Sequence, residues 1–165
     1  MEDRKVILKI EHLCKDFDIK AKSFTGKALK LHALSDISLD IYEGETLGII
    51  GESGCGKSTL GRCLVNLHPI TSGKLVYDGK ELNRLRKKER QALSREIQMV
   101  FQDPYSSLDP RKTAAKIIAE PLVVHKLEPD KKKRDDKVLG LMREVGLDVQ
   151  HVNRFPLEFS GGQSE

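Results

Sequence analysis

One eight-residue segment constrains the fold of this chain more than any other feature. Residues 51–58 read G-E-S-G-C-G-K-S and match the pattern G-x-x-x-x-G-K-[ST] at every fixed position. The segment before it, residues 46–50, is short and continuously apolar, which predicts a strand buried on both faces. After it, apolar residues recur with the spacing of one helix face, at Leu60, Cys63, Leu64 and Leu67. A buried strand, a glycine-rich loop and a helix in this order predict a loop that wraps around phosphate groups.

The residue types in this loop suit nucleotide binding. Glycines let the backbone turn sharply, so that its N–H groups face phosphate oxygens. Lys57 supplies a cation for the β- and γ-phosphates, Ser58 a hydroxyl for Mg²⁺, and Thr59 a contact to the α-phosphate. The candidate binding residues are Gly51, Ser53, Gly54, Cys55, Gly56, Lys57, Ser58 and Thr59. The alternative is a strand-to-helix turn that binds nothing, which the flanking pattern disfavours. A kinase-type glycine loop is excluded, because Lys57 directly follows the last glycine.

The remaining N-terminal half has the patterns of a sheet. Apolar and polar residues alternate over residues 6–11 and 37–42, which predicts two half-buried strands. The polar stretch 15–30 between them reads as a long excursion or hairpin tip, and Glu43-Gly44-Glu45 as a turn. Further strands are expected at 73–79 and 97–102, with a basic helical surface segment at 82–95 between them.

The C-terminal half is polar and helical in pattern. A helix is expected from Ala114 to Ala119, interrupted near Pro121. A second is expected over residues 130–145, with a solvated start at 131–137 and a stop at Gly146. The apolar face of this second helix would consist of Val138, Leu141, Met142 and Val145.

Composition and charge exclude several classes of protein. With 38% hydrophobic and 33% charged residues, the chain fits a soluble globular domain. The net charge of +4 is too mild to indicate nucleic-acid binding, and the basic run 84–90 fits a solvated helix face. No apolar run approaches the roughly 20 residues of a membrane span. The N-terminus M-E-D-R-K has no apolar core behind it, so a cytosolic protein, or one peripheral to the membrane, is expected. The three cysteines fit neither a disulfide framework nor a zinc site.

Three segments in the right order carry a family resemblance. Residues 42–60 (Y-E-G-E-T-L-G-I-I-G-E-S-G-C-G-K-S-T-L) look like the ATP-binding subunit of an ATP-binding-cassette (ABC) transporter. Residues 99–111 (M-V-F-Q-D-P-Y-S-S-L-D-P-R) are similar to the Q-loop of the oligopeptide/dipeptide importer branch. Residues 159–163 (F-S-G-G-Q) resemble the ABC signature, with Phe159 in place of the usual leucine.

The resemblance implies a fold and its division into domains. It implies an α/β fold: a P-loop NTPase core of the ABC type, with a partial parallel sheet and N-terminal antiparallel strands, carrying a helical subdomain. Residues 1–103 would form the ATP-binding core and residues 104–165 the helical subdomain that ends at the signature.

The resemblance also assigns roles to residues outside the phosphate loop. Gln102 would be the catalytic Q-loop glutamine that touches Mg²⁺ or the attacking water. Phe17 would stack on adenine, with Phe24 as a rival for the same place and a plain core phenylalanine as the alternative. The signature would cap the γ-phosphate of an ATP held by a second subunit, through Ser160, Gly161, Gly162 and Gln163.

The implied cofactors and partners follow from the same family. ATP and Mg²⁺ would be bound, and the partners would be membrane permease subunits, a second ABC ATPase subunit and, indirectly, a peptide-binding protein. No nucleic acid is expected. The protein would lie in the cytoplasm, at the inner face of the cell membrane.

The sequence departs from the family after the signature. No run of four apolar residues followed by D-E is present, and His68, His125 and His151 do not have the context of the switch histidine. We therefore expect a chain truncated just after the signature, with the C-terminal part of the fold missing. Without its neighbouring strand, the segment 46–50 would have an open edge and uncovered apolar surface. Two alternatives to a peptide-importer ATPase stay open: a nucleotide-binding fragment without turnover, and an ABC protein without a transport role.

Overall fold

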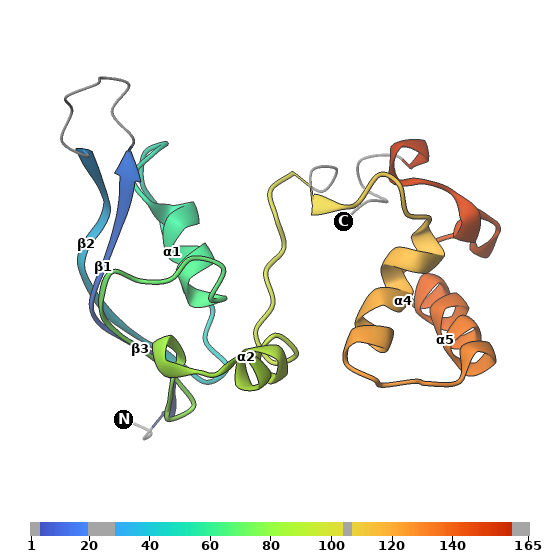
Figure 1. The fold of residues 1–165 in the computed structure, drawn as a ribbon, viewed down its shortest axis with the longest axis horizontal. Coiled ribbons are helices and arrows are strands. Elements are labelled where there is room, and N and C mark those ends of the chain that lie inside the picture. Colours follow the sequence, from blue (N-terminus) through green and yellow to red (C-terminus); the bar gives the residue numbers. More distant parts are fainter. Residues whose placement is uncertain (1–3, 20–28, 104–106, 160–165) are drawn as a thin grey trace. The chain divides into compact units, whose positions relative to one another are not determined.

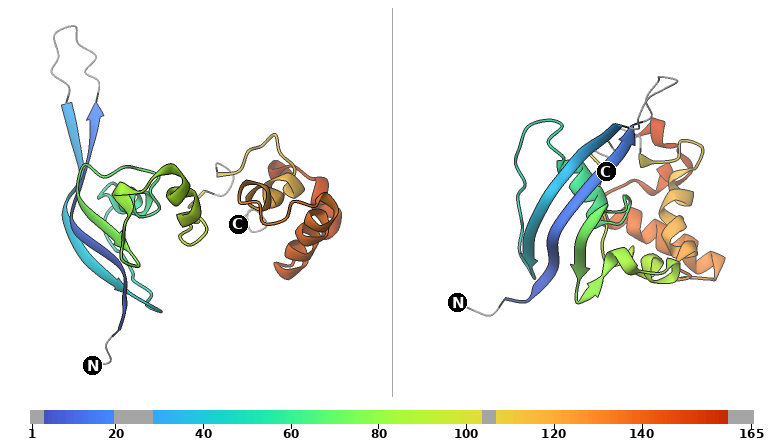
Figure 2. Two further views of the ribbon diagram at one scale, coloured as in Figure 1. Left: turned by 60° about the horizontal axis from the view of Figure 1, so that its bottom comes forward. Right: turned by 60° about the vertical axis from the view of Figure 1, so that its left-hand side comes forward.

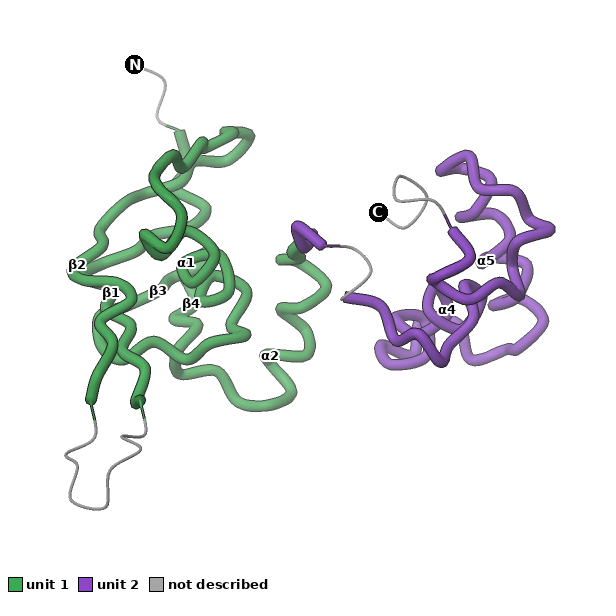
Figure 3. Tube along the Cα trace, turned by 90° about the horizontal axis from the view of Figure 1, so that it is seen from above, with its two compact units in different colours: residues 1–99 green, residues 100–165 purple. Residues whose placement is uncertain are grey.

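Two long antiparallel strands form the centre of the N-terminal part of the chain (Figure 1). The computed structural model describes residues 4–19, 29–103 and 107–159. The chain divides into two compact units, residues 1–99 and residues 100–165 (Figure 3). Among the described residues, no helix has the length and the hydropathy needed to cross a bilayer.

The sheet of the first unit is antiparallel and has the strand order β2-β1-β3-β4. Its strands are β1 (Val6–Ile19), β2 (Leu29–Tyr42), β3 (Ser72–Tyr77) and β4 (Lys80–Glu81). The strands predicted at 6–11, 37–42 and 73–79 are confirmed. The first two are longer than predicted, because they pair with each other as far as Ile19 opposite Leu29. The hairpin tip between them lies outside the described residues.

One hydrophobic core lies between this curved sheet and the helix that follows the phosphate loop (Figure 2). The helix, α1 (Lys57–Leu64), buries Leu60 and Cys63 against the sheet, as its spacing predicts. Leu67 lies beyond the helix end and is exposed. The predicted segment 82–95 is helical, as η1 (Leu82–Arg84) and α2 (Lys87–Leu93). The buried core residues are Leu8, Ile10, Leu13, Leu34, Leu60, Cys63, Leu75, Leu82 and Leu93.

Two strand predictions in this unit and just beyond it are wrong. Residues 46–50 and 97–102 contain no strand, because no described segment pairs with either of them. A strand needs a neighbour for its backbone hydrogen bonds. Segment 46–50 is exposed rather than buried, and Ile50 is 99% exposed. The apolar side chains of segment 46–50 are therefore uncovered, as expected from the sequence when the neighbouring strand is missing.

The second unit is helical. Helices α4 (Ala114–Val124) and α5 (Lys131–Glu144) pack together with the short helical turn η2 (Val149–Asn153). A further short helical turn, η3 (Pro156–Glu158), follows. Its buried core consists of Leu122, Val138 and Met142. The predicted interruption at Pro121 is wrong, since α4 continues through it to Val124. A proline removes one backbone donor, and burial of Leu122 in the next position favours continuing the helix.

Helix α5 begins and ends where the sequence indicates. The side chain of Asp130 accepts a hydrogen bond from the backbone N–H of Lys133 at 2.9 Å, an N-cap contact. Gly146, with φ of 75°, follows the helix end. Of the predicted apolar face, Val138 and Met142 are buried, whereas Val145 is 72% exposed. Val145 is the C-cap residue, so its backbone has already left the helical geometry that aligned it with Met142.

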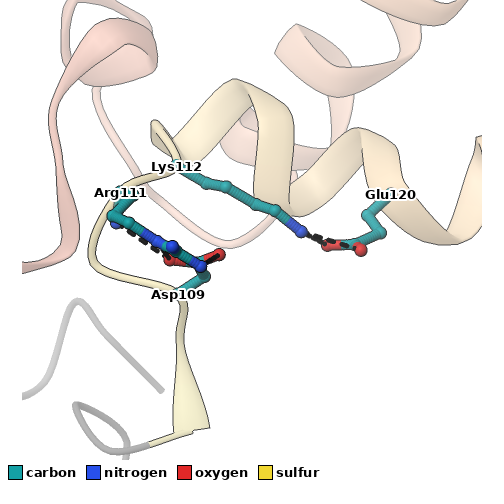
Figure 4. Close-up of polar contacts among 4 residues, drawn as sticks. All are labelled: Asp109, Arg111, Lys112 and Glu120. Atoms are coloured by element: carbon teal, nitrogen blue, oxygen red, sulfur yellow. Dashed lines mark hydrogen bonds and ion pairs between the residues drawn. The ribbon is translucent and has the colours of Figure 1, made fainter.

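Two ion pairs order the segment that leads into α4 (Figure 4). Arg111 donates from its backbone N–H and from two guanidinium nitrogens to the carboxylate of Asp109, at 3.0–3.2 Å. Lys112 Nζ lies 2.7 Å from Glu120 on α4. The Arg111 guanidinium holds the pKa of Asp109 below its usual value, mainly through the side-chain hydrogen bond.

Candidate nucleotide-binding site

The glycine-rich loop is fixed to the sheet at Gly56. Gly56 has φ of 102° and precedes the first residue of α1. A Cβ atom placed there would lie 2.6 Å from the carbonyl oxygen of Ala33 and 2.9 Å from Leu34 Cδ2, both on β2. Only glycine fits both the backbone conformation and the close approach. Gly56 therefore has a specific structural role: it lets the loop approach β2 closely.

The start of α1 presents unpaired backbone donors. Leu60 N donates to Gly56 O at 2.8 Å, which is the first hydrogen bond of the helix. The N–H groups of Lys57, Ser58 and Thr59 have no acceptor among the described residues, and no side chain caps the helix. No acidic residue occupies the first turn. Free N–H groups and the positive end of the helix dipole suit an anion, and phosphate in particular.

The Lys57 side chain bridges the loop. Its ammonium donates to Gly51 O at 2.7 Å and to Glu52 O at 2.6 Å, and lies 3.5 Å from Cys55 Sγ. The Lys57 ammonium thus contacts the first two residues of the loop, Gly51 and Glu52. The backbone N–H of Lys57 lies at the start of α1. A phosphate bound in the loop could accept from both groups of the same residue.

The other loop residues have matching surroundings. Cys55, Ser53, Gly54 and Ser58 are exposed, and Thr59 is half-buried. A Cβ atom on Gly51 would lie 2.8 Å from Cys55 Sγ, so the thiol occupies the space that a side chain at position 51 would need. All predicted phosphate-loop residues, 51–59, are described and form one continuous loop and helix start.

Phe17 belongs to the same unit as the loop and is held by two neighbours. It lies on β1 opposite Leu31 of β2, two residues before the Ala33 that contacts Gly56. Its ring packs nearly perpendicular to that of His68, with centroids 5.4 Å apart. The ammonium of Lys15 lies over the ring, 4.6 Å from its centroid. Neither Lys15 nor His68 belongs to a motif, so the sequence assigns neither of them a role beside Phe17. The contacts of both residues with the ring are seen in the structure alone.

The other predicted site residues belong to the second unit or lie outside the described residues. Gln102 is exposed and belongs to the second unit. Ser160, Gly161, Gly162 and Gln163 lie outside the described residues, as does Phe24. Among the described residues, no group of three or more histidine, cysteine or acidic side chains is placed to hold a metal ion.

Comparison with known proteins agrees with this geometry. Residues 34–165 match the ABC transporter family. The chain belongs to this family. It is 46% identical over 160 residues to the oligopeptide transport ATP-binding protein OppF of Bacillus subtilis, covering 96% of this chain and 50% of that protein. It is also 42% identical to the glutathione import ATP-binding protein GsiA of Pectobacterium atrosepticum, covering 96% of this chain and 25% of that protein.

Solved structures support the fold of this ABC family member. A dimeric post-hydrolysis state of the ATP-binding cassette MJ0796, bound to ADP and Pi, matches with a TM-score of 0.78 and 28% identity, covering 95% of this chain and 65% of that one. The ABC-type fold expected from the sequence is thus confirmed, although the described residues form only its antiparallel strands and helices. The chain spans about half the length of the OppF protein that it matches.

Proposed function

We propose that this chain binds ATP at residues 51–59 and that, in the complete protein, ATP hydrolysis powers the import of peptides through a membrane permease. One observation carries the first part. The unpaired N–H groups of Lys57, Ser58 and Thr59 lie at the start of the helix to which the Lys57 ammonium also belongs. The second part is supported by the relatives, whose names specify oligopeptide transport and glutathione import.

The proposed roles follow from the donors that each residue offers. The free N–H groups and the Lys57 ammonium would hold the β- and γ-phosphates, and Thr59 would contact the α-phosphate. The exposed hydroxyl of Ser58 fits a hard, oxygen-preferring cation, so Ser58 would hold Mg²⁺. Gln102 would keep the role of the Q-loop glutamine that the family resemblance implies. Mg²⁺ would neutralise charge that develops on the phosphate oxygens. Phe17 would stack on adenine, because a half-buried aromatic ring in the same unit as the loop offers an apolar face.

The proposed partners are a second ATPase subunit and the permease. Ser160 to Gln163 would cap the ATP of the second subunit, and the matching MJ0796 cassette is dimeric. Residues 1–103 would be the ATP-binding core, and residues 104–165 would be the helical subdomain that receives the permease at the inner membrane face. Co-purification with permease subunits, and loss of peptide uptake in cells carrying Lys57→Ala, would support this arrangement. Normal uptake with Lys57→Ala would count against it.

We further propose that the 165 residues alone bind ATP without useful turnover. Phosphoryl transfer depends on a placed metal, an oriented water and charge stabilisation acting together. The 165 residues include Lys57, Ser58 and Gln102, but no apolar run ending in D-E. Steady-state phosphate release by this chain should equal that of its Lys57→Ala variant. Release well above that variant would contradict the proposal.

Equilibrium binding tests the nucleotide site itself. Titration calorimetry with Mg·ATP should give saturable binding to the chain, which Lys57→Ala removes. Lys5→Ala is a suitable control, because Lys5 is an exposed lysine that pairs with Asp78 on the same unit. Equal ATP affinity for the chain and for Lys57→Ala would exclude residues 51–59 as the site.

A further inference from the structure

Lys15 is the one charged residue that is buried among the described residues, at 8% exposure. Its ammonium forms no ion pair and no hydrogen bond with them. The fully buried side-chain nitrogens without a partner in the described part of the chain are Asn66 Nδ2 and His151 Nδ1, so the Lys15 stem is buried while its ammonium still reaches water. The contact that the ammonium does make is with the face of an aromatic ring.

Lys15 contacts the ring of Phe17, the residue proposed to stack on adenine. Lys15 and Phe17 are two residues apart on β1, and the ammonium lies 4.6 Å from the centroid of the Phe17 ring. Lys15 is opposite Leu34 in the strand register, and Leu34 borders Gly56 of the phosphate loop. On the helix side it lies near Cys63 of α1: burial raises the pKa of that thiol, and the Lys15 charge opposes the change. The cation thus lies over the Phe17 ring, and Lys15 pairs on the sheet with the residue of β2 that borders the loop anchor Gly56.

A cation over one face of an aromatic ring has two effects. It attracts the ring's electrons and holds the ring in one orientation, and this attraction is strongest where water is excluded. It also occupies that face, so that a base can stack only on the opposite one. A ring fixed in this way loses less conformational freedom when a base binds to it.

We propose that Lys15 is a positioning residue for the nucleobase: its ammonium holds the Phe17 ring so that the opposite face receives adenine. This inference rests on the proposed ATP-binding function. It adds the nucleobase to the groups of ATP that the chain recognises. Lys15 would act on the base through Phe17, without touching the base or the phosphates. Lys15 should therefore affect ligands that carry a base and not ligands that consist of phosphates alone.

The test compares ATP with inorganic tripolyphosphate, both with Mg²⁺, by titration calorimetry. Lys15→Met keeps the length of the side chain and removes the charge, and we expect it to weaken ATP binding on the order of tenfold. Tripolyphosphate binding should stay unchanged. Lys15→Arg should restore ATP affinity, because a guanidinium also lies well over an aromatic ring. Lys9→Met is the matched control, an exposed lysine on the same strand that pairs with Glu11.

Two further measurements separate positioning from a structural role. Lys15→Met should melt close to the unmodified chain, since methionine keeps the apolar packing of the buried lysine stem. In a Phe17→Leu background, Lys15→Met should have no additional effect on ATP, because the ring through which Lys15 acts is gone.

The outcomes distinguish this inference from the function on which it rests. Unchanged ATP binding by Lys15→Met, an equal loss of ATP and tripolyphosphate, or a variant that no longer folds would overturn the role of Lys15 while leaving the phosphate site in place. Absence of ATP binding by the unmodified chain would instead overturn the proposed function, and the role of Lys15 with it.

Discussion

The ammonium of Lys57 lies 2.7 Å from the carbonyl oxygen of Gly51, six residues earlier in the chain. This contact joins the two ends of the phosphate loop through the side chain of its lysine. The two carbonyl oxygens that Lys57 contacts are neutral acceptors, whereas phosphate oxygens are charged and bind an ammonium more strongly. Binding of ATP is therefore expected to exchange these contacts for phosphate contacts.

Gly56→Ala should destabilise the first unit more than a matched glycine substitution does. Both Gly56 and Gly79 have positive φ, 102° and 76°, but only Gly56 would place its new Cβ against β2, while Gly79 faces open space. Each left-handed alanine costs about 1–3 kcal/mol. The clash with Ala33 adds to this cost at Gly56 alone. Urea unfolding of Gly56→Ala and Gly79→Ala measures the difference, and equal losses would show that the loop is not seated on β2.

The phosphate loop could be predicted from the sequence. The conformation of segment 46–50 and the contact between Lys15 and Phe17 could not. The motif specifies backbone geometry over a few consecutive residues, so Gly56 and Lys57 lie where their spacing predicts. Segment 46–50 was predicted as a buried strand because its composition fits one. Strand formation, however, depends on a neighbour that local sequence does not describe, and Ile50 is exposed. The contact of Lys15 with Phe17 depends on strand register and on burial, and neither residue belongs to the loop motif.

The reactivity of Cys55 should report occupancy of the loop. Cys55 is exposed and its Sγ lies 3.5 Å from the Lys57 ammonium, whereas Cys63 is buried in the core. A maleimide should label Cys55 first, and bound ATP should protect it by covering the loop. Mass spectrometry of labelled peptides with and without ATP checks this prediction. Cys55→Ser serves as the control, and labelling at Cys55 that ATP leaves unchanged would contradict it.

The uncovered apolar segment should make the chain self-associate. Leu47, Ile49 and Ile50 are exposed in a segment whose backbone pairs with no described strand. An exposed apolar segment with unpaired backbone groups favours association between molecules. Sedimentation velocity should show concentration-dependent association that Ile49→Ser with Ile50→Ser reduces. Val145→Ser removes an exposed apolar residue elsewhere and serves as the control. A monodisperse monomer at all concentrations would argue against the prediction.

Asp109 should titrate at an unusually low pH. The adjacent Arg111 lowers the pKa of Asp109 below its ordinary value of 3.8. A carboxylate with a depressed pKa stabilises the folded state above its ordinary pKa, and this contribution is lost as the pH falls through the folded value. Because the Arg111 side chain is 87% exposed, this ion pair contributes little to the stability of the whole fold. NMR titration of Arg111→Met should show the Asp109 pKa returning toward 3.8. An unchanged pKa would mean that the ion pair does not form in solution.

Backbone amide NMR during an ATP titration tests the central claim most directly. If the N–H groups at the start of α1 hold phosphate, the resonances of Lys57, Ser58 and Thr59 should shift with a common saturation curve. Those of Val76 and Lys80, on β3 and β4, should not. Tripolyphosphate should shift the same amides, and Lys57→Ala should weaken the response to both ligands. Amides of residues 57–59 that stay in place while resonances elsewhere saturate with ATP would contradict the account.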